Sequence, residues 1–204
     1  MTTLPLFPLR TVLFPGAVQG LKVFEARYLD LVSGCLRSQQ PFGIICLKAG
    51  SEMVGSNGNP VQLEEVGTLA HIEEVDAEQA GILRLRCIGG QRFRLLAPAQ
   101  QQESGLWLAN KFELVPNDPV RLPGPAMLLT VNALAEAIRK LQTQDRVPFA
   151  PPFKLDDAGW VANRWCELLP VSLAAKQKLM QLEDPMIRLS LVDGFLRDKK
   201  VVVG

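Results

Sequence analysis

With 204 residues, of which 48% are hydrophobic and 21% charged, the chain is long enough to bury one or two cores and lacks the composition of a disordered protein. Its 22 basic and 21 acidic residues leave a formal net charge of +1, so no overall field favours a phosphate backbone, an anionic lipid surface or a strongly charged substrate. Any charge selectivity must therefore be local.

The first 118 residues contain short apolar runs that are broken by Gly, Pro and Asn, which is typical of strands and turns. A turn is predicted at Pro15-Gly16, an amphipathic helix over Glu25–Gln39, a surface loop over Gly50–Pro60 and a hairpin turn at Gly89-Gly90. The predicted strands are Leu4–Phe7, Gln19–Phe24, Phe42–Lys48, Val66–Val75, Ile82–Ile88, Gln91–Leu96 and Leu106–Val115. This pattern indicates a curled sheet or a small barrel with one helix.

The pattern changes after a cluster of prolines at positions 116, 119, 123 and 125, which predicts a stiff linker. Long runs of helical period follow, and Asp156, Asp157, Ser172 and Asp184 stand where helix N-caps are expected. The predicted helices are Ala126–Gln144, Ala158–Leu169, Leu173–Glu183 and Met186–Arg197. We therefore expect an α+β protein with a β-rich lobe over residues 1–118 and an α-helical lobe over residues 119–204.

The N-terminal decapeptide MTTLPLFPLR has no basic segment followed by an apolar one, and no apolar run approaches the ~20 residues of a membrane-spanning helix. We expect a cytoplasmic protein without a membrane partner. Four widely spaced cysteines, at positions 35, 46, 87 and 166, form no CxxC pair. They indicate buried small apolar residues rather than a zinc or redox site.

A search for catalytic patterns gives a mainly negative result. No lysine is followed by Ser or Thr, so the chain has no phosphate-binding loop of the ATPase type. His71 is the single histidine, and a hydrolase that pairs it with Cys46 or Cys87 stays open as an alternative, because such partners need only be close in space. We expect no catalytic residue, no metal site and no cofactor.

One stretch of the chain has an uneven charge distribution. Seven acidic residues and no basic one lie between Ala49 and Leu83, and four arginines without an acidic residue follow. These arginines are Arg84, Arg86, Arg92 and Arg94. They either pair with the acidic residues across neighbouring strands or form a basic face for RNA. The absence of surplus positive charge and of interleaved aromatic residues favours the pairing.

The opening LPLFPLRTVLFPGAVQGLKVFEARYLDLV resembles the N-terminal domain of Lon proteases, with its LPLFPL strand, VLFPG turn and FEARY helix start. The segments FGIICL, VGTLAHIEEV, GGQRFRLL and KQKLMQLEDPMIRLSLVDGFL extend the likeness over nearly the whole chain. The resemblance implies a curled sheet or pseudo-barrel similar to the PUA-like RNA-binding fold, followed by a helical lobe. It also implies a role in holding unfolded substrates. Because the chain stops where the ATPase and Ser-Lys peptidase of a complete Lon would begin, we expect a stand-alone, non-catalytic module.

Binding of unfolded polypeptides requires exposed apolar groups or strand edges. The apolar candidates are Phe14, Phe24, Tyr28, Met53 and Trp107. Glu25 and Arg27, at the start of the first helix, either support the fold or contact a ligand. The expected partners are unfolded or tagged polypeptides, together with a protease or chaperone; the alternative is a PUA-like domain that binds RNA or a small ligand through the four arginines.

Overall fold

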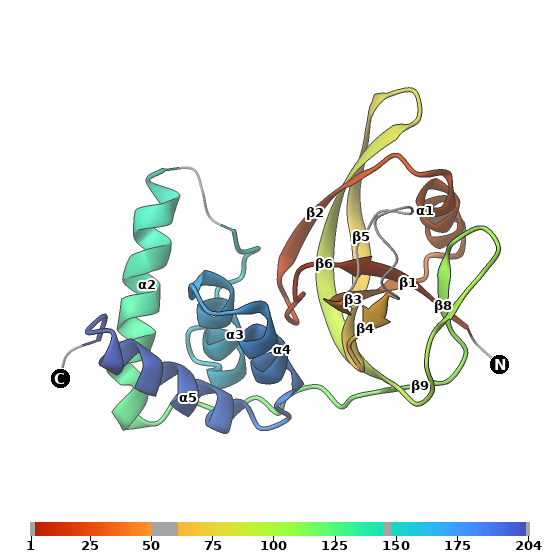
Figure 1. Cartoon of the computed structure of the whole chain (residues 1–204). Coiled ribbons are helices and arrows are strands. Elements are labelled where there is room, and N and C mark those ends of the chain that lie inside the picture. Colours follow the sequence, from red (N-terminus) through yellow and green to blue (C-terminus); the bar gives the residue numbers. More distant parts are fainter. Residues whose placement is uncertain (1–2, 50–60, 145–147, 203–204) are drawn as a thin grey trace. The chain divides into compact units, whose positions relative to one another are not determined.

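The computed structural model describes residues 3–49, 61–144 and 148–202. Contacts within the chain divide it into two compact units, Met1–Pro116 and Asn117–Gly204, which we call the sheet unit and the helical unit (Figure 1). Among the helices of the described residues, none combines the length and the apolar character that crossing a membrane requires.

The sheet unit is built on one mixed sheet. Its described strands are β1 (Leu4–Leu9), β2 (Val18–Val23), β3 (Phe42–Ala49), β4 (Gln62–Leu63), β5 (Val66–Gln79), β6 (Ile82–Leu95), β7 (Gln100–Gln101), β8 (Trp107–Ala109) and β9 (Phe112–Leu114). They follow the order β2-β6-β5-β3-β1-β8-β7, with β4 paired to β3 and β9 paired to β6. All pairs are antiparallel except β1 with β3.

The sheet closes on itself through β8 and β9. Only Asn110 and Lys111 separate these two strands. Nevertheless, β8 pairs with β1 and β9 pairs with β6. Since β6, β5, β3 and β1 are consecutive neighbours in the sheet, the two short strands join its ends into a small barrel. The expected curled sheet or pseudo-barrel and the α+β class are confirmed.

The barrel interior is packed around Phe93, which is fully buried together with Leu6 and Ile45. Two glycines make room for its ring. A Cβ atom on Gly67 would lie 2.5 Å from both the Phe93 ring and the Ile44 carbonyl oxygen, and a Cβ on Gly43 would lie 2.8 Å from the same ring. Side-chain atoms cannot approach that closely, so the aromatic core depends on both glycines.

The opposite face of the sheet packs against helix α1 (Ala26–Ser38). Phe7 alternates with Leu6 along β1, so it points away from the barrel interior. Its ring stacks on Tyr28 of α1 with centroids 3.9 Å apart, and it lies 6.1 Å from the ring of Phe42. The helix ends at Gln39, which has a φ of 54°. The apolar stripe that predicted this helix is therefore the face that it buries.

The prediction of a hairpin turn at Gly89-Gly90 is wrong, because both glycines lie inside the continuous strand β6. They permit close approach of neighbouring groups. A Cβ on Gly89 would lie 2.3 Å from the Phe14 carbonyl oxygen, and one on Gly90 would lie 2.6 Å from Nε2 of His71. A pair of glycines predicts a turn only where no other segment of the chain packs closely against them. That close packing depends on the tertiary structure.

Two other strand predictions need correction. The predicted strand Leu106–Val115 is divided into β8 and β9, and β5 continues past Val75 to Gln79. With this extension, β5 and β6 form a long hairpin that projects from the rest of the sheet unit (Figure 1).

The helical unit contains a 3-10 turn, η1 (Pro125–Met127), and helices α2 (Leu128–Gln142), α3 (Ala158–Leu168), α4 (Leu173–Gln181) and α5 (Pro185–Asp198). Asp157, Ser172 and Asp184 cap α3, α4 and α5 by accepting hydrogen bonds from backbone N–H groups of the first turn. The caps expected at Ser172 and Asp184 are confirmed, and of the two acidic residues expected to cap α3, Asp156 and Asp157, it is Asp157 that does so.

Candidate functional site

A largely apolar groove of about 590 Å³ lies between α1 and the barrel, and we call it the α1 groove. Helix α1 contributes Asp30, Leu31, Gly34, Cys35 and Ser38. The barrel side consists of Thr3, Leu4, Pro5, Gln40, Pro41, Leu69, Leu106, Phe112 and Leu114. Since Leu4, Leu69 and Phe112 also belong to the barrel core, the groove reaches the core from outside.

The lining of the α1 groove suits apolar side chains. Asp30 is the one charged residue among the described residues that line it. Leu114 at its rim is 49% exposed, which leaves a large apolar side chain in contact with water. Gly34 leaves space within the helix wall, because a Cβ added there meets no atom within 4 Å. The groove can therefore accept an apolar group without displacing its own walls.

A second groove, of about 370 Å³, brings together three of the residues that we expected to bind a ligand. Phe24, Glu25 and Tyr28 line it, together with β2 and the end of β1, and we call it the β2 groove. Phe24 is 56% exposed, whereas Tyr28 is buried under Phe7. Only Phe24 presents a large apolar surface to an incoming chain.

Glu25 and Arg27 form contacts that hold parts of the fold together. Nη2 of the Arg27 guanidinium lies 2.8 Å from Oε2 of Glu25, and Nη1 donates to the Gly105 carbonyl oxygen at 2.8 Å. The guanidinium carbon lies 4.5 Å from the centre of the Tyr28 ring. Gly105, at a φ of 83°, belongs to the connection between β7 and β8. Arg27 thus ties that connection to the start of α1, which is the fold-supporting role that we weighed for it.

The remaining apolar candidates are dispersed. Phe14 is fully buried in the core, so its side chain takes no part in the surface. Trp107 is half-buried and lines a third groove of about 520 Å³ that also includes Leu96 and Pro98. Met53 lies outside the described residues. Among the described apolar candidates, Phe24 and Tyr28 therefore share the β2 groove, whereas Phe14 and Trp107 lie elsewhere.

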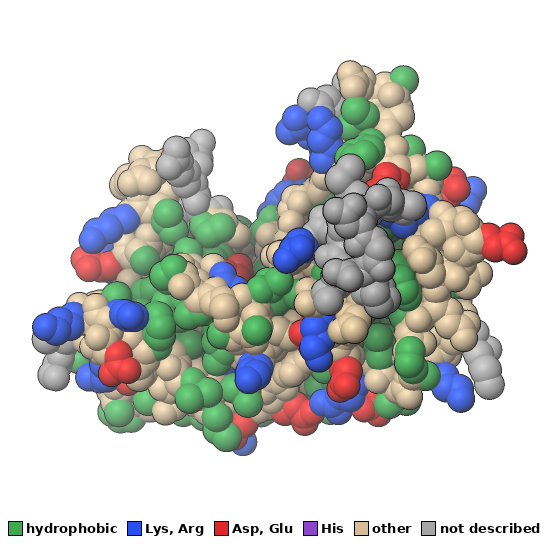
Figure 2. Space-filling model, in the orientation of Figure 1, with side chains coloured by type: hydrophobic (Ala, Val, Ile, Leu, Met, Phe, Trp, Pro, Cys, Tyr) green, Lys and Arg blue, Asp and Glu red, His purple; other side chains and the backbone are tan. Residues whose placement is uncertain are grey.

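The four arginines do not form a common basic face. Arg92 is 2% exposed and donates to the Pro116 carbonyl oxygen. Arg86 pairs with Glu73 and Glu74 on the neighbouring strand, and Nη1 of Arg94 lies 3.4 Å from Oε1 of Glu113. Figure 2 shows basic and acidic side chains interspersed over the visible face of the sheet unit. The Arg86 pairs are the cross-strand neutralisation that the sequence favoured, whereas Glu113, the partner of Arg94, lies outside the acidic run between Ala49 and Leu83.

Two thiols of the sheet unit are harder to deprotonate than an ordinary thiol. Cys35, Cys46 and Cys87 are free and buried. Burial raises the pKa of Cys87 to about 12 and raises that of Cys35 as well. A nucleophilic cysteine needs the opposite shift. His71 is exposed and faces the backbone of Gly90, so the geometry gives no support to a cysteine hydrolase.

The sequence did not single out the residues of the α1 groove. Leu106, Phe112 and Leu114 were read as an ordinary strand, and Gly34 as part of an amphipathic helix. One available signal was the spacing of Asp30, Gly34 and Ser38, which puts small or polar residues at four-residue intervals beside the buried stripe. A glycine inside a helix lowers helix stability by about 1 kcal/mol relative to alanine, so its presence there can indicate open space beside the helix.

Comparisons with known proteins agree in identifying the chain. The sequence profile of the ATP-dependent protease La (LON) substrate-binding domain matches residues 3–198. A Lon protease of Paraburkholderia phytofirmans is 27% identical over 203 residues, which cover 92% of this chain and 23% of the relative. Lon protease 2 of Herpetosiphon aurantiacus is 26% identical over 201 residues, again with 23% of its length covered. The chain therefore spans about a quarter of the length of these relatives.

Solved structures show the same relation. The Lon N-terminal domain protein from Xanthomonas campestris is 32% identical, with a TM-score of 0.73 over 95% of this chain and 98% of that one. The N-terminal domain of the Mycobacterium avium complex Lon protease shares the fold, with a TM-score of 0.60 over 97% of this chain and 99% of that one, at 16% identity. The chain matches the substrate-binding region of Lon rather than its protease region, and it belongs to the LON substrate-binding domain family.

Proposed function

We propose that this protein is a non-catalytic module that binds non-native polypeptides, and that the α1 groove takes up their apolar side chains. The observation that carries the proposal is the apolar lining of this groove, which is continuous with the barrel core and leaves Leu114 exposed at its rim. Membership in a substrate-binding domain family supports a polypeptide as the ligand.

The chemistry of the groove fits this class of ligand. A native protein buries its large apolar side chains, whereas an unfolded one exposes them, so an apolar groove discriminates between the two states. Each methylene group removed from water contributes about 0.8 kcal/mol, so a single Leu or Phe side chain adds a few kcal/mol at most. Several weak contacts along one client would give useful affinity, and a protease or chaperone that acts on the client is part of the proposal.

The test blocks the α1 groove with a larger side chain on one of its own lining residues. In Gly34→Leu, the new side chain extends from the wall of α1 into the groove, while Gly34→Ala changes the helix propensity and leaves the groove open. Gly194→Leu on α5 is a matched control, because Gly194 is also a helical glycine whose added Cβ meets nothing within 4 Å. Binding of each variant to a labelled, permanently unfolded carboxymethylated protein is measured by fluorescence anisotropy.

We expect Gly34→Leu to weaken binding by about tenfold, which corresponds to about 1.4 kcal/mol. Gly34→Ala and Gly194→Leu should bind as the wild type does. The same variants should show no affinity for the native form of the labelled protein. If Gly34→Leu binds the unfolded protein as tightly as Gly34→Ala, the α1 groove is not the binding site.

A further inference from the structure

Strand β2 is the end strand of the sheet. Within the described residues, it pairs with β6 alone, from Val18 opposite Ile88 to Val23 opposite Leu83, without a shift of register. An end strand of this kind directs half of its backbone N–H and C=O groups away from its partner. A regular, bulge-free edge is the geometry that an additional strand requires.

The hydrogen bonds identify which positions point outward. The Ala17 carbonyl oxygen accepts from Gly89 N at 2.9 Å, so the positions bonded to β6 recur at Gln19, Leu21 and Val23. The outward positions are then Val18, Gly20 and Lys22. Gly20 is exposed, and its carbonyl oxygen accepts a hydrogen bond from the side chain of its neighbour Gln19. A glycine at such a position allows another backbone to approach closely.

The β2 groove runs along this outer edge. All residues from Gln19 to Glu25 line it, which means that residues from both faces of the strand do so. A groove on one face of the sheet would be lined by alternate residues only. The end of β1, from Phe7 to Thr11, forms the other wall. The groove therefore offers space for the side chains of a strand placed beside β2.

The other long edge in this part of the sheet, on β5, is protected in ways that the β2 edge is not. Strand β3 pairs with β5 only at positions 68–70, so the projecting half of β5 lacks that neighbour. This half has exposed carboxylates at Glu73, Glu74 and Asp76, and its pairing with β6 contains two register shifts. Charges and bulges are the usual means of blocking strand addition. On β2, by contrast, the register is continuous and Lys22 is the single charged residue.

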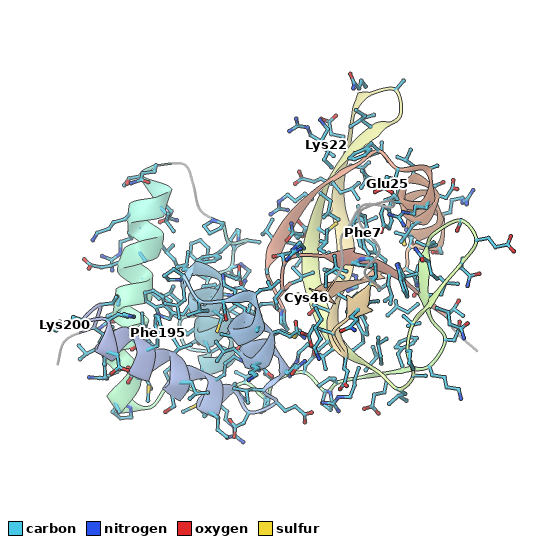
Figure 3. The ribbon with its side chains drawn as sticks, viewed as in Figure 1. Phe7, Lys22, Glu25, Cys46, Phe195 and Lys200 are labelled. Carbon is cyan, nitrogen blue, oxygen red and sulfur yellow. The ribbon has the colours of Figure 1, made fainter. Side chains whose placement is uncertain are left out.

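Charge specifies what kind of strand fits. Lys22 lies opposite Arg84 on β6, and Arg84 lies opposite Asp76 on β5, so this row across the sheet has two cations and one carboxylate. Lys22 is labelled in Figure 3, where it lies on β2 near the start of α1. An acidic residue added beyond Lys22 in the same row would place a carboxylate beside Lys22, so that two cations and two carboxylates balance along the row.

We propose that the outer edge of β2 accepts an extended polypeptide segment as an additional strand, with an Asp or Glu residue opposite Lys22. The inference rests on the proposed function in one respect, that the occupant is a segment of a client polypeptide. It adds a second site, which selects an extended backbone and an acidic residue, whereas the α1 groove selects apolar side chains.

The test uses the full chain and a fluorescent peptide of alternating Thr and Val residues with one central Glu. Two variants of this peptide test separately the backbone pairing and the preference for an acidic residue. One has N-methyl groups on alternate amides, which removes backbone donors and retains every side chain. The other has Lys in place of the central Glu. Binding is measured by anisotropy at low ionic strength, because salt screens the charge preference.

Variants of the protein complete the design. Gly20→Pro removes the outward N–H, and Gly20→Ala is its matched control, since an added Cβ at this position meets no atom. We expect Gly20→Ala to bind the Glu peptide as the wild type does and Gly20→Pro to bind it at least about tenfold more weakly. Lys22→Glu should reverse the preference between the Glu and Lys peptides. The N-methylated peptide should not bind to any variant.

Equal affinity of the wild type for the methylated and unmethylated peptides would overturn the proposal, and this measurement is valid even if Gly20→Pro fails to fold. Loss of Glu-peptide binding in Gly34→Leu would also overturn it, because the peptide would then occupy the α1 groove. If Gly34→Leu leaves binding of the unfolded protein unchanged while methylation still abolishes peptide binding, the groove proposal fails and the edge proposal stands.

Discussion

Replacing Arg188 by methionine should strongly lower the free energy of unfolding of the helical unit, because this arginine is the centre of a buried polar network. It is 1% exposed. Its Nη1 donates to Asp118 Oδ2 at 2.6 Å and to Asn163 Oδ1 at 3.0 Å, and its Nε donates to the Leu179 carbonyl oxygen at 2.9 Å. A further bond reaches the Leu182 carbonyl oxygen. The guanidinium therefore joins α5 to α3, to the end of α4 and to the segment that precedes η1.

The magnitude follows from what the substitution leaves behind. Methionine fills a similar volume but donates no hydrogen bond, so the Asp118 carboxylate, whose side chain is 15% exposed, loses its countercharge. Breaking a buried ion pair by removing one partner costs about 3–5 kcal/mol. Arg188→Lys retains the charge but loses the planar guanidinium group that reaches several acceptors. We expect it to lower the stability by about half as much as Arg188→Met. Removing both charges in Asp118→Asn/Arg188→Met should cost less than the sum of the single changes.

The assay should follow the helical unit by itself. Trp160 and Trp165 both lie in α3, and Trp107 is the third tryptophan of the chain. In a Trp107→Phe background, fluorescence during urea unfolding reports on the helical unit, and circular dichroism reports on the whole chain. A loss of less than about 1 kcal/mol for Arg188→Met, measured in this background, would show that the network is not the stabilising element that its geometry indicates.

Three further changes test other parts of the structure. Gly67→Ala should destabilise the sheet unit by about 1–3 kcal/mol, since the new Cβ would lie 2.5 Å from a backbone oxygen, and a calorimetric scan without a lower Tm would contradict this packing. Burial raises the pKa of Glu167 from 4.5 to about 7, so the folded state holds this proton more tightly than the unfolded state. The resulting stability is fully present below about pH 4.5 and is lost as the pH rises through about 7, on the order of 3 kcal/mol. Urea titrations should show that Glu167→Gln removes this dependence. Asp184→Ala should cost about 1 kcal/mol by removing the cap of α5, and Asp184→Asn should retain most of it in the same titrations.

Local patterns predicted the elements of this fold well where one short-range interaction determines them. The stripe with Tyr28, Leu31 and Cys35 predicted α1, and the caps at Ser172 and Asp184 predicted where α4 and α5 begin. Hydrophobic period and capping act within a few residues, so a single sequence contains the required information. The family motif over the opening residues identified the chain for the same reason, as a dense local pattern.

The candidate site was predicted less completely, because a groove is formed by residues that are distant in the sequence. Phe14 and Phe24 were equal candidates for an exposed apolar group, yet Phe24 is exposed and Phe14 is fully buried. Hydropathy cannot separate these two phenylalanines, since it does not say which neighbours each one meets. The α1 groove joins positions 3 to 114, and no local pattern relates them.

By itself, the sequence determined the family, the α+β class and the starts of the capped helices, because these depend on local patterns. The tertiary structure decided that Gly89 and Gly90 are points of close approach rather than a turn, that β8 and β9 close the barrel, and that β2 ends the sheet with its outer edge along a groove. Each of these depends on which strand lies beside which, and strand order is set by burial of the whole core rather than by any segment alone.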